Sequence, residues 1–392
     1  MAECIHVQRD DNGRYELTTF ADEQVRAFVP RPLPPMPPLV LTGMQRSIEQ
    51  AGASLGRLDS ESRLLPDPEL FIYAYVRREA QLSSQIEGTQ SSLPDLFELE
   101  LDGTAELSGD DALEVSNYVS ALEHGLRRIR DGFPISNRLM REMHRLLLHS
   151  GRGSKKQPGA FRRSQNWIGG TRPGNAVYVP PPAELIEDCM ADLERFIHDQ
   201  THGFPAVVRA GLVHAQFESI HPFLDGNGRL GRLLIGFILQ NEGLLREPLL
   251  YLSLYLKRER QTYYDLLSQL RTRGDWESWL EFFITGVRET ADDAVQTARR
   301  LAELFATDRA RIAGQGRRAG SALRAHEALK RSPLVSIRHV QQQTGVSWPT
   351  ASAAIELLTD LDIAREITGR KSDRLFAYGE YIDILSEGAE PL

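Results

Sequence analysis

The chain has 392 residues, of which 46 are Lys or Arg and 54 are Asp or Glu, so its net charge is −8, with 41% hydrophobic and 26% charged residues. This composition is typical of a globular protein with roughly two to three domains, and it excludes a disordered or collagen-like chain. The longest apolar runs, such as residues 233–239, are too short to span a membrane, which needs roughly 18 to 20 residues.

The N-terminus and the cysteines favour a reducing, cytoplasmic location. Residues 1–4 have neither the basic nor the apolar region of a secretion signal. Two distant cysteines, Cys4 and Cys189, cannot form a disulfide framework or a zinc site. Because the net charge is acidic, any binding to nucleic acid would need a local basic patch.

The first predicted elements are a strap and a helix. The proline-rich residues 30–38 predict extended polyproline II, because each proline ring fixes φ and removes a donor. We interpret this segment as a strap on the protein itself in preference to an exposed SH3-type ligand. Residues 68–87 predict a helix that starts after Asp67 and ends before Gly88.

Most of the remaining chain is predicted to be α-helical. Between 151 and 182 the periodicity breaks, and residues 166–168 and 176–179 flank a turn-rich stretch, which predicts a β-hairpin with a mobile tip. Helical spacing recurs at 111–129, 136–149, 183–199, 205–219, 229–245 and 258–272, with more through 310.

Residues 314–318 predict a linker into a final unit. That unit has two helical patterns joined at 344–347, followed by short strands at 363–367 and 375–378, which is the order of a winged helix-turn-helix.

The charges of this final unit argue against sequence-specific DNA binding. Its second helix, 348–361, contains no Lys, Arg, Asn or Gln, the residue types that read base edges. Only the loop between its strands is basic, with Arg370, Lys371 and Arg374. We therefore favour a protein-contact or dimerisation module, with a homodimer as one such partner, over a DNA reader.

Residues 221–232, HPFLDGNGRLGR, combine several features that act on phosphates. Apolar spacing after this segment places a helix start near Arg229, so the Gly226-Asn227-Gly228 turn lies at a helix N-terminus. There, converging backbone N–H groups and the helix dipole favour phosphate. Arg229 and Arg232 add cations on one face.

Two further side chains of this segment add chemistry. A carboxylate beside a phosphate is repulsive unless a cation lies between them, so Asp225 implies Mg²⁺. His221 can exchange a proton near neutral pH and is a candidate general base. Gly226, Gly228 and Gly231 also fit the GxGxxG dinucleotide pattern, but we reject that interpretation because a helix, not a strand, precedes them.

The segment resembles the Fic family core, HxFx(D/E)GNGRxxR, at every specified position. The resemblance implies a mainly α Fic-type fold whose members mostly transfer AMP from ATP to a hydroxyl of a target protein. It assigns His221 as the general base and Asp225 as the Mg²⁺ ligand. It also implies that the α- and β-phosphates are bound by Gly226, Asn227, Gly228 and Arg229, and that the γ-phosphate is bound by Arg232. Fic relatives that act as kinases have Lys at the position of Gly228, so AMP transfer is favoured.

The resemblance also implies two surrounding sites. The hairpin corresponds to the family's flap, which adds the target's backbone as a strand, here with Trp167, Ile168 and Tyr178. Tyr251 and Tyr263 are candidates for the adenine pocket, although an aromatic at helical spacing is more often core.

Ser83 to Gly88 fits the family's inhibitory pattern (S/T)xxxE(G/N). A carboxylate at a helix C-terminus opposes the helix dipole by roughly 0.3 to 1 kcal/mol unless a cation compensates. We expect Glu87 to pair with Arg232, which would then be unable to hold the γ-phosphate. The alternative is a solvated glutamate at a helix end.

The other histidines and two arginines near the flap are not assigned to the site. His144, His149, His198 and His214 are expected to be structural. Arg162 and Arg163 could contact the site from the flap side, but we favour surface charges.

The sequence therefore predicts a self-inhibited protein adenylyltransferase that uses ATP and Mg²⁺ on a Ser, Thr or Tyr hydroxyl of a protein partner. The alternatives are a de-AMPylating enzyme at the same site and an ATP-sensing transcription regulator. Predicted domains are 1–115 (strap and inhibitory helix), 116–290 (Fic core), 291–319 (helical linker) and 320–392 (winged-helix-like).

Overall fold

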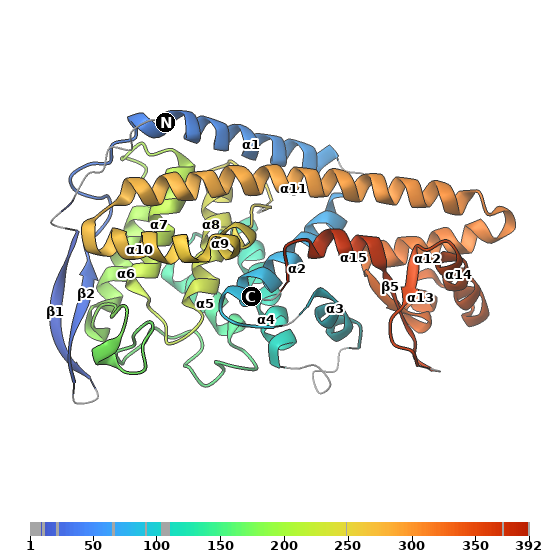
Figure 1. Ribbon diagram of the computed structural model, residues 1–392, viewed down its shortest axis with the longest axis horizontal. Coiled ribbons are helices and arrows are strands. Elements are labelled where there is room, and N and C mark those ends of the chain that lie inside the picture. The colour runs from blue at the N-terminus through green and yellow to red at the C-terminus, as the bar shows by residue number, and fades with distance from the viewer. Residues whose placement is uncertain are drawn as a thin grey trace. The chain divides into compact units, whose positions relative to one another are not determined.

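The chain divides into two compact units. Unit 1 comprises residues 1–59 and 117–292, and unit 2 comprises residues 60–116 and 293–392. Three helices contain the points where the chain passes between units: α1 (Gln45–Leu64), α4 (Asp110–Arg130) and α11 (Trp276–Ala313) (Figure 1). The computed structural model describes residues 9, 12–20, 23–64, 67–90, 92–102, 110–247, 249–370 and 372–390.

Unit 1 is built around two buried helices, α7 (Ala206–Ile220) and α8 (Asn227–Asn241), which pack against each other. Almost every residue of α7 is buried, as expected for a helix that is apolar on all sides. Three helices contact this pair: α6 (Ile186–His198) and α10 (Arg260–Arg273) contact α7, and α5 (Asn137–Leu147) contacts α8. The short helix α9 (Ser253–Arg258) contacts α10. The loop between α7 and α8 carries the predicted phosphate-binding residues.

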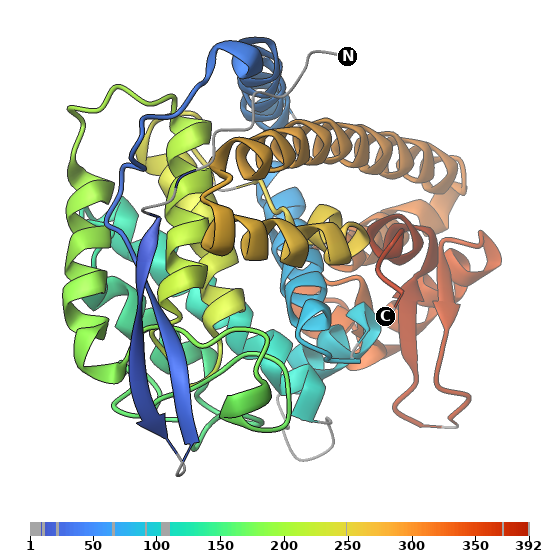
Figure 2. The same ribbon diagram turned by 60° about the vertical axis from the view of Figure 1, so that its left-hand side comes forward.

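An N-terminal antiparallel hairpin, β1 (Gly13–Phe20) with β2 (Glu23–Pro30), also belongs to unit 1 and was not predicted. Figure 2 shows this blue hairpin beside the green segment that contains the predicted flap. Phe28 N donates to Val179 O at 2.9 Å, and the side chains of Val25 and Ala27 pack on Val179. The hairpin is thus stabilised by docking as well as by its own ladder.

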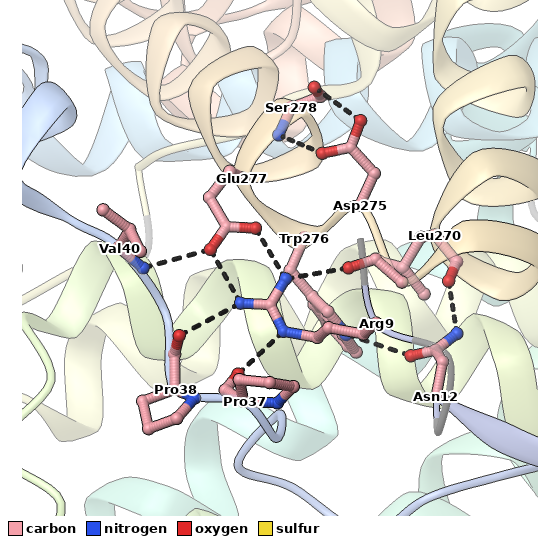
Figure 3. A network of polar contacts seen from close by, with 11 residues as sticks. Arg9, Asn12, Pro37, Pro38, Val40, Leu270, Asp275, Trp276, Glu277 and Ser278 are labelled. Atoms are coloured by element: carbon pink, nitrogen blue, oxygen red, sulfur yellow. Dashed lines mark hydrogen bonds and ion pairs between the residues drawn. The ribbon is translucent and has the colours of Figure 1, made fainter. Parts of the chain in front are cut away.

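The proline-rich strap lies on unit 1, as predicted, but it is not polyproline II. Its backbone bends at 33–34 and 36–37, where the Leu33–Pro34 and Met36–Pro37 bonds are cis. The buried Arg9 guanidinium donates to Pro37 O at 2.8 Å and to Pro38 O at 3.2 Å (Figure 3). It also forms a bidentate pair with Glu277, with both N–O distances 2.7 Å.

Unit 2 contains α2 (Pro68–Ile86), whose bounds and Asp67 cap agree with the prediction. Its C-terminal part runs helix, strand, two helices and two strands, and the sheet order is β3-β5-β4, all antiparallel. Besides α2, unit 2 contains α3 (Leu93–Asp102) from the first part of the chain. Its C-terminal part contains α12 (Ala319–Arg331), β3 (Leu334–Ser336), α13 (Ile337–Thr344), α14 (Trp348–Asp360), β4 (Ala364–Glu366), β5 (Leu375–Tyr378) and α15 (Gly379–Ser386). The two helices joined at 344–347 and the two strands after them occur in the predicted order, and α12, β3 and α15 are additional elements. The winged-helix assignment remains a prediction.

The mainly α fold class is confirmed. The stretch predicted as a helical linker is mostly the end of α11, and residues 314–318 form only a turn and a short 3₁₀ segment before α12. Cys4 and Lys371 lie outside the described residues. Among the helices that the structure describes, none has the length and hydropathy needed to cross a membrane.

Candidate active site

The loop between α7 and α8 reverses the chain with two left-handed residues. His221 follows the last residue of α7 with φ +49°, and Gly226 precedes the first residue of α8 with φ +76°. A non-glycine residue with positive φ is uncommon and costs free energy, so it persists where the surroundings hold it in place. The loop conformation therefore fixes the imidazole next to a helix N-terminus.

The Asn227 side chain holds this loop closed. Phe223 N donates to Asn227 Oδ1 and Asn227 Nδ2 donates to Phe223 O, both at 2.9 Å. Asn227 was predicted to help cradle the phosphates, and both polar atoms of its side chain are used by the loop. What Asn227 offers a phosphate is its backbone N–H at the helix start, which has no intrahelical acceptor.

His144 supports the same loop from α5. Its ring stacks on Phe223 with centroids 3.8 Å apart, Gly159 N donates to its Nδ1 at 2.8 Å, and its Nε2 lies 2.9 Å from Asp225 O. The two bonds require a neutral ring that accepts at Nδ1 and donates at Nε2. Burial lowers the pKa of His144 to about 4, which keeps the ring neutral. The predicted structural role of His144 is confirmed.

Arg162 is a site residue that sequence reasoning assigned wrongly. The residue is only 1% exposed, so the favoured prediction of a surface charge is wrong and the alternative, contact with the site, is correct. Nε donates to His221 O at 3.0 Å, Nη2 to Pro181 O at 2.5 Å and Nη1 to Ser164 O at 3.2 Å. A single guanidinium thus ties the segment before α6 to the carbonyl of the predicted base. The adjacent Arg163 is exposed, as predicted.

We expect Arg162→Leu to lower the free energy of unfolding by about 3 kcal/mol or more, because each buried carbonyl left without a donor costs about 1 to 3 kcal/mol. Urea unfolding followed by circular dichroism measures this change. The matched control, Arg163→Leu, should stay within about 0.5 kcal/mol of the wild type. Equal effects of the two substitutions would show that the carbonyl contacts do not stabilise the loop.

The imidazole of His221 is neutral at physiological pH. Burial lowers its pKa to about 3, and the cations of Arg271 and Arg162 lower it further in the same direction. Its Nδ1 is buried and has no hydrogen-bond partner among the described residues. A neutral ring can accept a proton, which is the state that a general base needs before reaction.

The start of α8 is suited to bind an anion. The first backbone N–H groups of a helix have no intrahelical acceptor, and the helix dipole adds partial positive charge. Arg229 and Arg232 lie in the first two turns and are 2% and 5% exposed. The glycine at position 231 has a packing role. A Cβ there would lie 2.5 Å from Glu218 Oε1, so only glycine permits this close packing of α7 on α8. This packing role accounts for the third glycine of the rejected dinucleotide pattern.

Asp225 is partly exposed and contributes one carboxylate. Its Oδ1 accepts from Gly226 N at 2.6 Å and lies 3.3 Å from Arg229 Nη2, and its side chain is 35% exposed. The described residues contain no group of three His, Cys, Asp or Glu side chains that could hold a metal ion. Mg²⁺ commonly uses one or two carboxylates together with substrate phosphates, so this donor set fits a metal carried mainly by a nucleotide.

The predicted flap hairpin is a single antiparallel bridge between Ile168 and Tyr178. Its tip was predicted to be mobile, but Glu23 of β2 forms an ion pair with Arg172 at 2.7 Å and accepts from Gly174 N at 2.7 Å. The flap is therefore braced by the N-terminal hairpin, which sequence analysis missed.

The flap residues predicted to dock a target are largely engaged within the protein. The backbone groups of Ile168 and Tyr178 pair with each other, with N–O distances of 2.8 and 3.1 Å. The Tyr178 hydroxyl donates to Ser219 O at 2.5 Å, and the ring of Trp167 packs near Phe20. Strand addition at these positions would have to replace existing bonds, and the exposed neighbour is Val177, at 80%.

The two tyrosines proposed for adenine are buried. Tyr263 is 1% exposed and its hydroxyl lies 3.0 Å from His214 Nε2, whereas Tyr251 is 8% exposed. His214 Nδ1 in turn lies 2.9 Å from Gly231 O. The structure gives Tyr263 a packing role, and its contact with adenine remains a prediction that requires the core to open. The structural role predicted for His214 is confirmed.

Because burial lowers the pKa of His214 to about 4, this residue should make stability depend on pH. The unfolded chain takes up the proton near pH 6.5 and the folded chain does not, so stability falls as pH drops from 6.5 towards 4. We expect the free energy of unfolding, measured with urea at each pH, to fall more steeply between pH 6 and 4.5 in the wild type than in His214→Gln. The expected difference between the two slopes is about 1.4 kcal/mol per pH unit. Equal slopes would contradict a depressed pKa.

The predicted inhibitory residues lie at the end of α2 in unit 2. Ser83 is fully buried, whereas Glu87 is exposed at the position that caps α2. Gly88 follows with φ +96°, a conformation that favours glycine. The local prediction of a helix that ends at Glu87 and Gly88 is confirmed; the inhibitory role remains a prediction.

Comparison with known families agrees with this geometry. Residues 45–127 match the Fic/DOC family N-terminal model, and residues 134–239 match the Fic/DOC family model. The first match contains Glu87 and the second contains the loop from His221 to Arg232. These two regions are therefore a Fic/DOC family N-terminal domain and a Fic/DOC family domain.

Its relatives include curated proteins named protein adenylyltransferase Fic. The protein of Drosophila grimshawi is 32% identical over 152 residues, and that of Aedes aegypti is 33% identical over 152 residues. Each match covers 38% of this chain and only 28% and 27% of the relative. A Fic family protein from Desulfovibrio desulfuricans has the same fold, with a TM-score of 0.57 and 22% identity over 87% of this chain and 97% of that chain.

Proposed function

We propose that this protein is a self-inhibited protein adenylyltransferase, which transfers AMP from ATP to a Ser, Thr or Tyr hydroxyl of a target protein. The observation that carries the proposal is the α7–α8 loop, in which a neutral imidazole directly precedes an anion-binding helix start. The curated relatives' name supports the same reaction class.

In this reaction the target hydroxyl gives its proton to the imidazole of His221. The hydroxyl oxygen attacks the α-phosphorus, the new P–O bond replaces the bond to the β-phosphate, and pyrophosphate leaves. Backbone N–H groups at the start of α8, together with Arg229, stabilise the charge on the phosphates. The phosphates also raise the pKa of His221 when ATP binds, which makes the ring a stronger base.

Asp225 would hold Mg²⁺ beside the phosphates, and the metal would supply charge neutralisation there. The protein's contribution is the orientation of that carboxylate by Gly226 N. The His144 ring holds the Asp225 backbone through its carbonyl oxygen.

Glu87 would inhibit the enzyme by pairing with Arg232 and withholding it from the γ-phosphate. Three features support this: the match to the family's inhibitory pattern, the exposed position of Glu87 at a helix end, and the Fic/DOC N-terminal match around it. ATP would then bind in an unproductive pose until the pair opens.

The position of a radioactive label in ATP tests the reaction. We expect the Glu87→Gly protein, incubated with cell lysate, to leave α-labelled but not γ-labelled phosphate on protein. Labelling from the γ-position would indicate a kinase and overturn the proposal. ATP binding without transfer of either label would indicate a sensor, and release of AMP from modified protein without any labelling would indicate the reverse enzyme.

A further inference from the structure

Two carbonyls in the last turn of α7 lose their usual helical donors. In an α-helix, each carbonyl accepts from the N–H four residues later. For Glu218 O that position is Pro222, which has no N–H. The donor expected for Ser219 O is Phe223 N, but that group donates to Asn227 Oδ1 instead. Both carbonyls, directly before the predicted base, therefore need donors from outside the helix.

Side chains from α10 and from the flap supply these donors. Arg271, in the last turn of α10, donates from Nη2 to Glu218 O at 3.0 Å and from Nε to Ser219 Oγ at 3.3 Å. The Tyr178 hydroxyl donates to Ser219 O at 2.5 Å. The two side chains also touch each other, because the guanidinium carbon of Arg271 lies 3.9 Å from the centroid of the Tyr178 ring. Together they form one clamp on the end of α7.

The guanidinium of this clamp also acts on the imidazole of His221. The pKa of His221 is about 3; burial lowers it most, and the cations of Arg271 and Arg162 lower it further. The Glu218 carbonyl acts in the opposite direction. Arg162 donates to His221 O from the segment before α6, so the two cations come from different elements. Replacing Arg271 alone therefore changes the charge near the base and leaves the other cation in place.

We propose that Arg271 is a positioning residue, which holds the last turn of α7, and with it His221, against the flap. The proposal rests on the function proposed above, in which His221 is the general base. It also accounts for Tyr178, a predicted target-docking residue whose ring and hydroxyl both belong to the clamp. Such positioning matters because a misplacement of about 1 Å can cost roughly 10²-fold in rate.

Labelling rates in the Glu87→Gly parent test the positioning role. We expect Arg271→Leu to lower the initial rate of α-label transfer by about tenfold or more. ATP should bind with the affinity of the parent, because the anion-binding groups belong to the start of α8. The matched control is Arg273→Leu, which removes an exposed cation from the same turn of α10 and should label at the parent rate.

The pH dependence of the labelling rate separates positioning of the base from a general loss of packing. Loss of a cation near the imidazole raises its pKa, so more of the rings are protonated and inactive at low pH. In Arg271→Leu the acid side of the pH–rate profile should therefore move upward by about one pH unit. Arg271→Lys keeps the charge and one donor, so its profile should stay in place and its rate should partly recover. Arg273→Leu should leave the profile unchanged.

Hydrogen exchange followed by mass spectrometry tests the clamp without using activity. The His221 amide donates to Phe217 O at 2.9 Å. The peptide that contains this amide should exchange about tenfold faster in Arg271→Leu, whereas peptides of α8 should exchange as in the parent.

Four results would each overturn the positioning role: Arg271→Leu labels like Arg273→Leu, its lost rate is matched by lost ATP affinity, its pH profile stays in place, or exchange at His221 does not change. A Glu87→Gly parent that transfers no label would instead contradict the adenylyltransferase function. The exchange result would then still decide whether Arg271 holds the end of α7.

Discussion

Replacing His221 with alanine should reduce the transfer of α-labelled phosphate to protein by about 10² to 10⁴-fold, the usual contribution of a general base. The reason is local. His221 is held in a left-handed conformation at the end of α7, its ring is neutral, and Nδ1 has no hydrogen-bond partner among the described residues. Initial labelling rates in the Glu87→Gly background measure the loss, since inhibition would otherwise hide it.

The matched control is His149→Ala, because His149 is exposed just after α5 and belongs to no part of the proposed site. It should label at the wild-type rate. ATP binding by His221→Ala should be preserved, because the anion-binding groups belong to the start of α8. If His221→Ala labels as fast as His149→Ala, another group takes the proton and the proposed mechanism is wrong.

Signals that lie within a few residues of each other could be predicted from the sequence. The start of α2 follows from Asp67 and Pro68, and its end from Gly88, because caps and first-turn prolines act locally. The turn at Gly226 and the helix that starts beside it follow in the same way from the glycines and the apolar spacing after them. These local rules were sufficient to find the α7–α8 loop.

Features that depend on distant segments could not be predicted. Arg162 and Arg163 are equivalent as sequence, yet only Arg162 meets carbonyls from residues 164, 181 and 221. The strand β2 is buried because Val179, far along the chain, packs against it. The strand β3 has only three residues, and its partner β5 lies about 40 positions later in the chain. Helical spacing likewise cannot tell a core tyrosine from a pocket tyrosine, as Tyr263 shows.

Replacing Glu87 with glycine should give the largest gain of function, a rise of tenfold or more in α-label transfer. The expected factor follows from the pair that it removes: a bidentate bond between charged groups contributes about 1.5 to 3 kcal/mol, and 1.4 kcal/mol corresponds to tenfold. The substitution should not harm folding. Glu87 is exposed, it caps α2 through its backbone, and its charge opposes the helix dipole.

Two comparison variants separate the loss of inhibition from a general effect on the end of α2. Glu87→Gln keeps the shape and removes the charge, so it should activate nearly as much as glycine, because an amide cannot form an ion pair with Arg232. Gln90→Gly introduces glycine at an exposed position three residues later and should leave transfer unchanged. If Gln90→Gly activates as strongly as Glu87→Gly, backbone loosening is the cause, and the carboxylate does not hold the enzyme inactive.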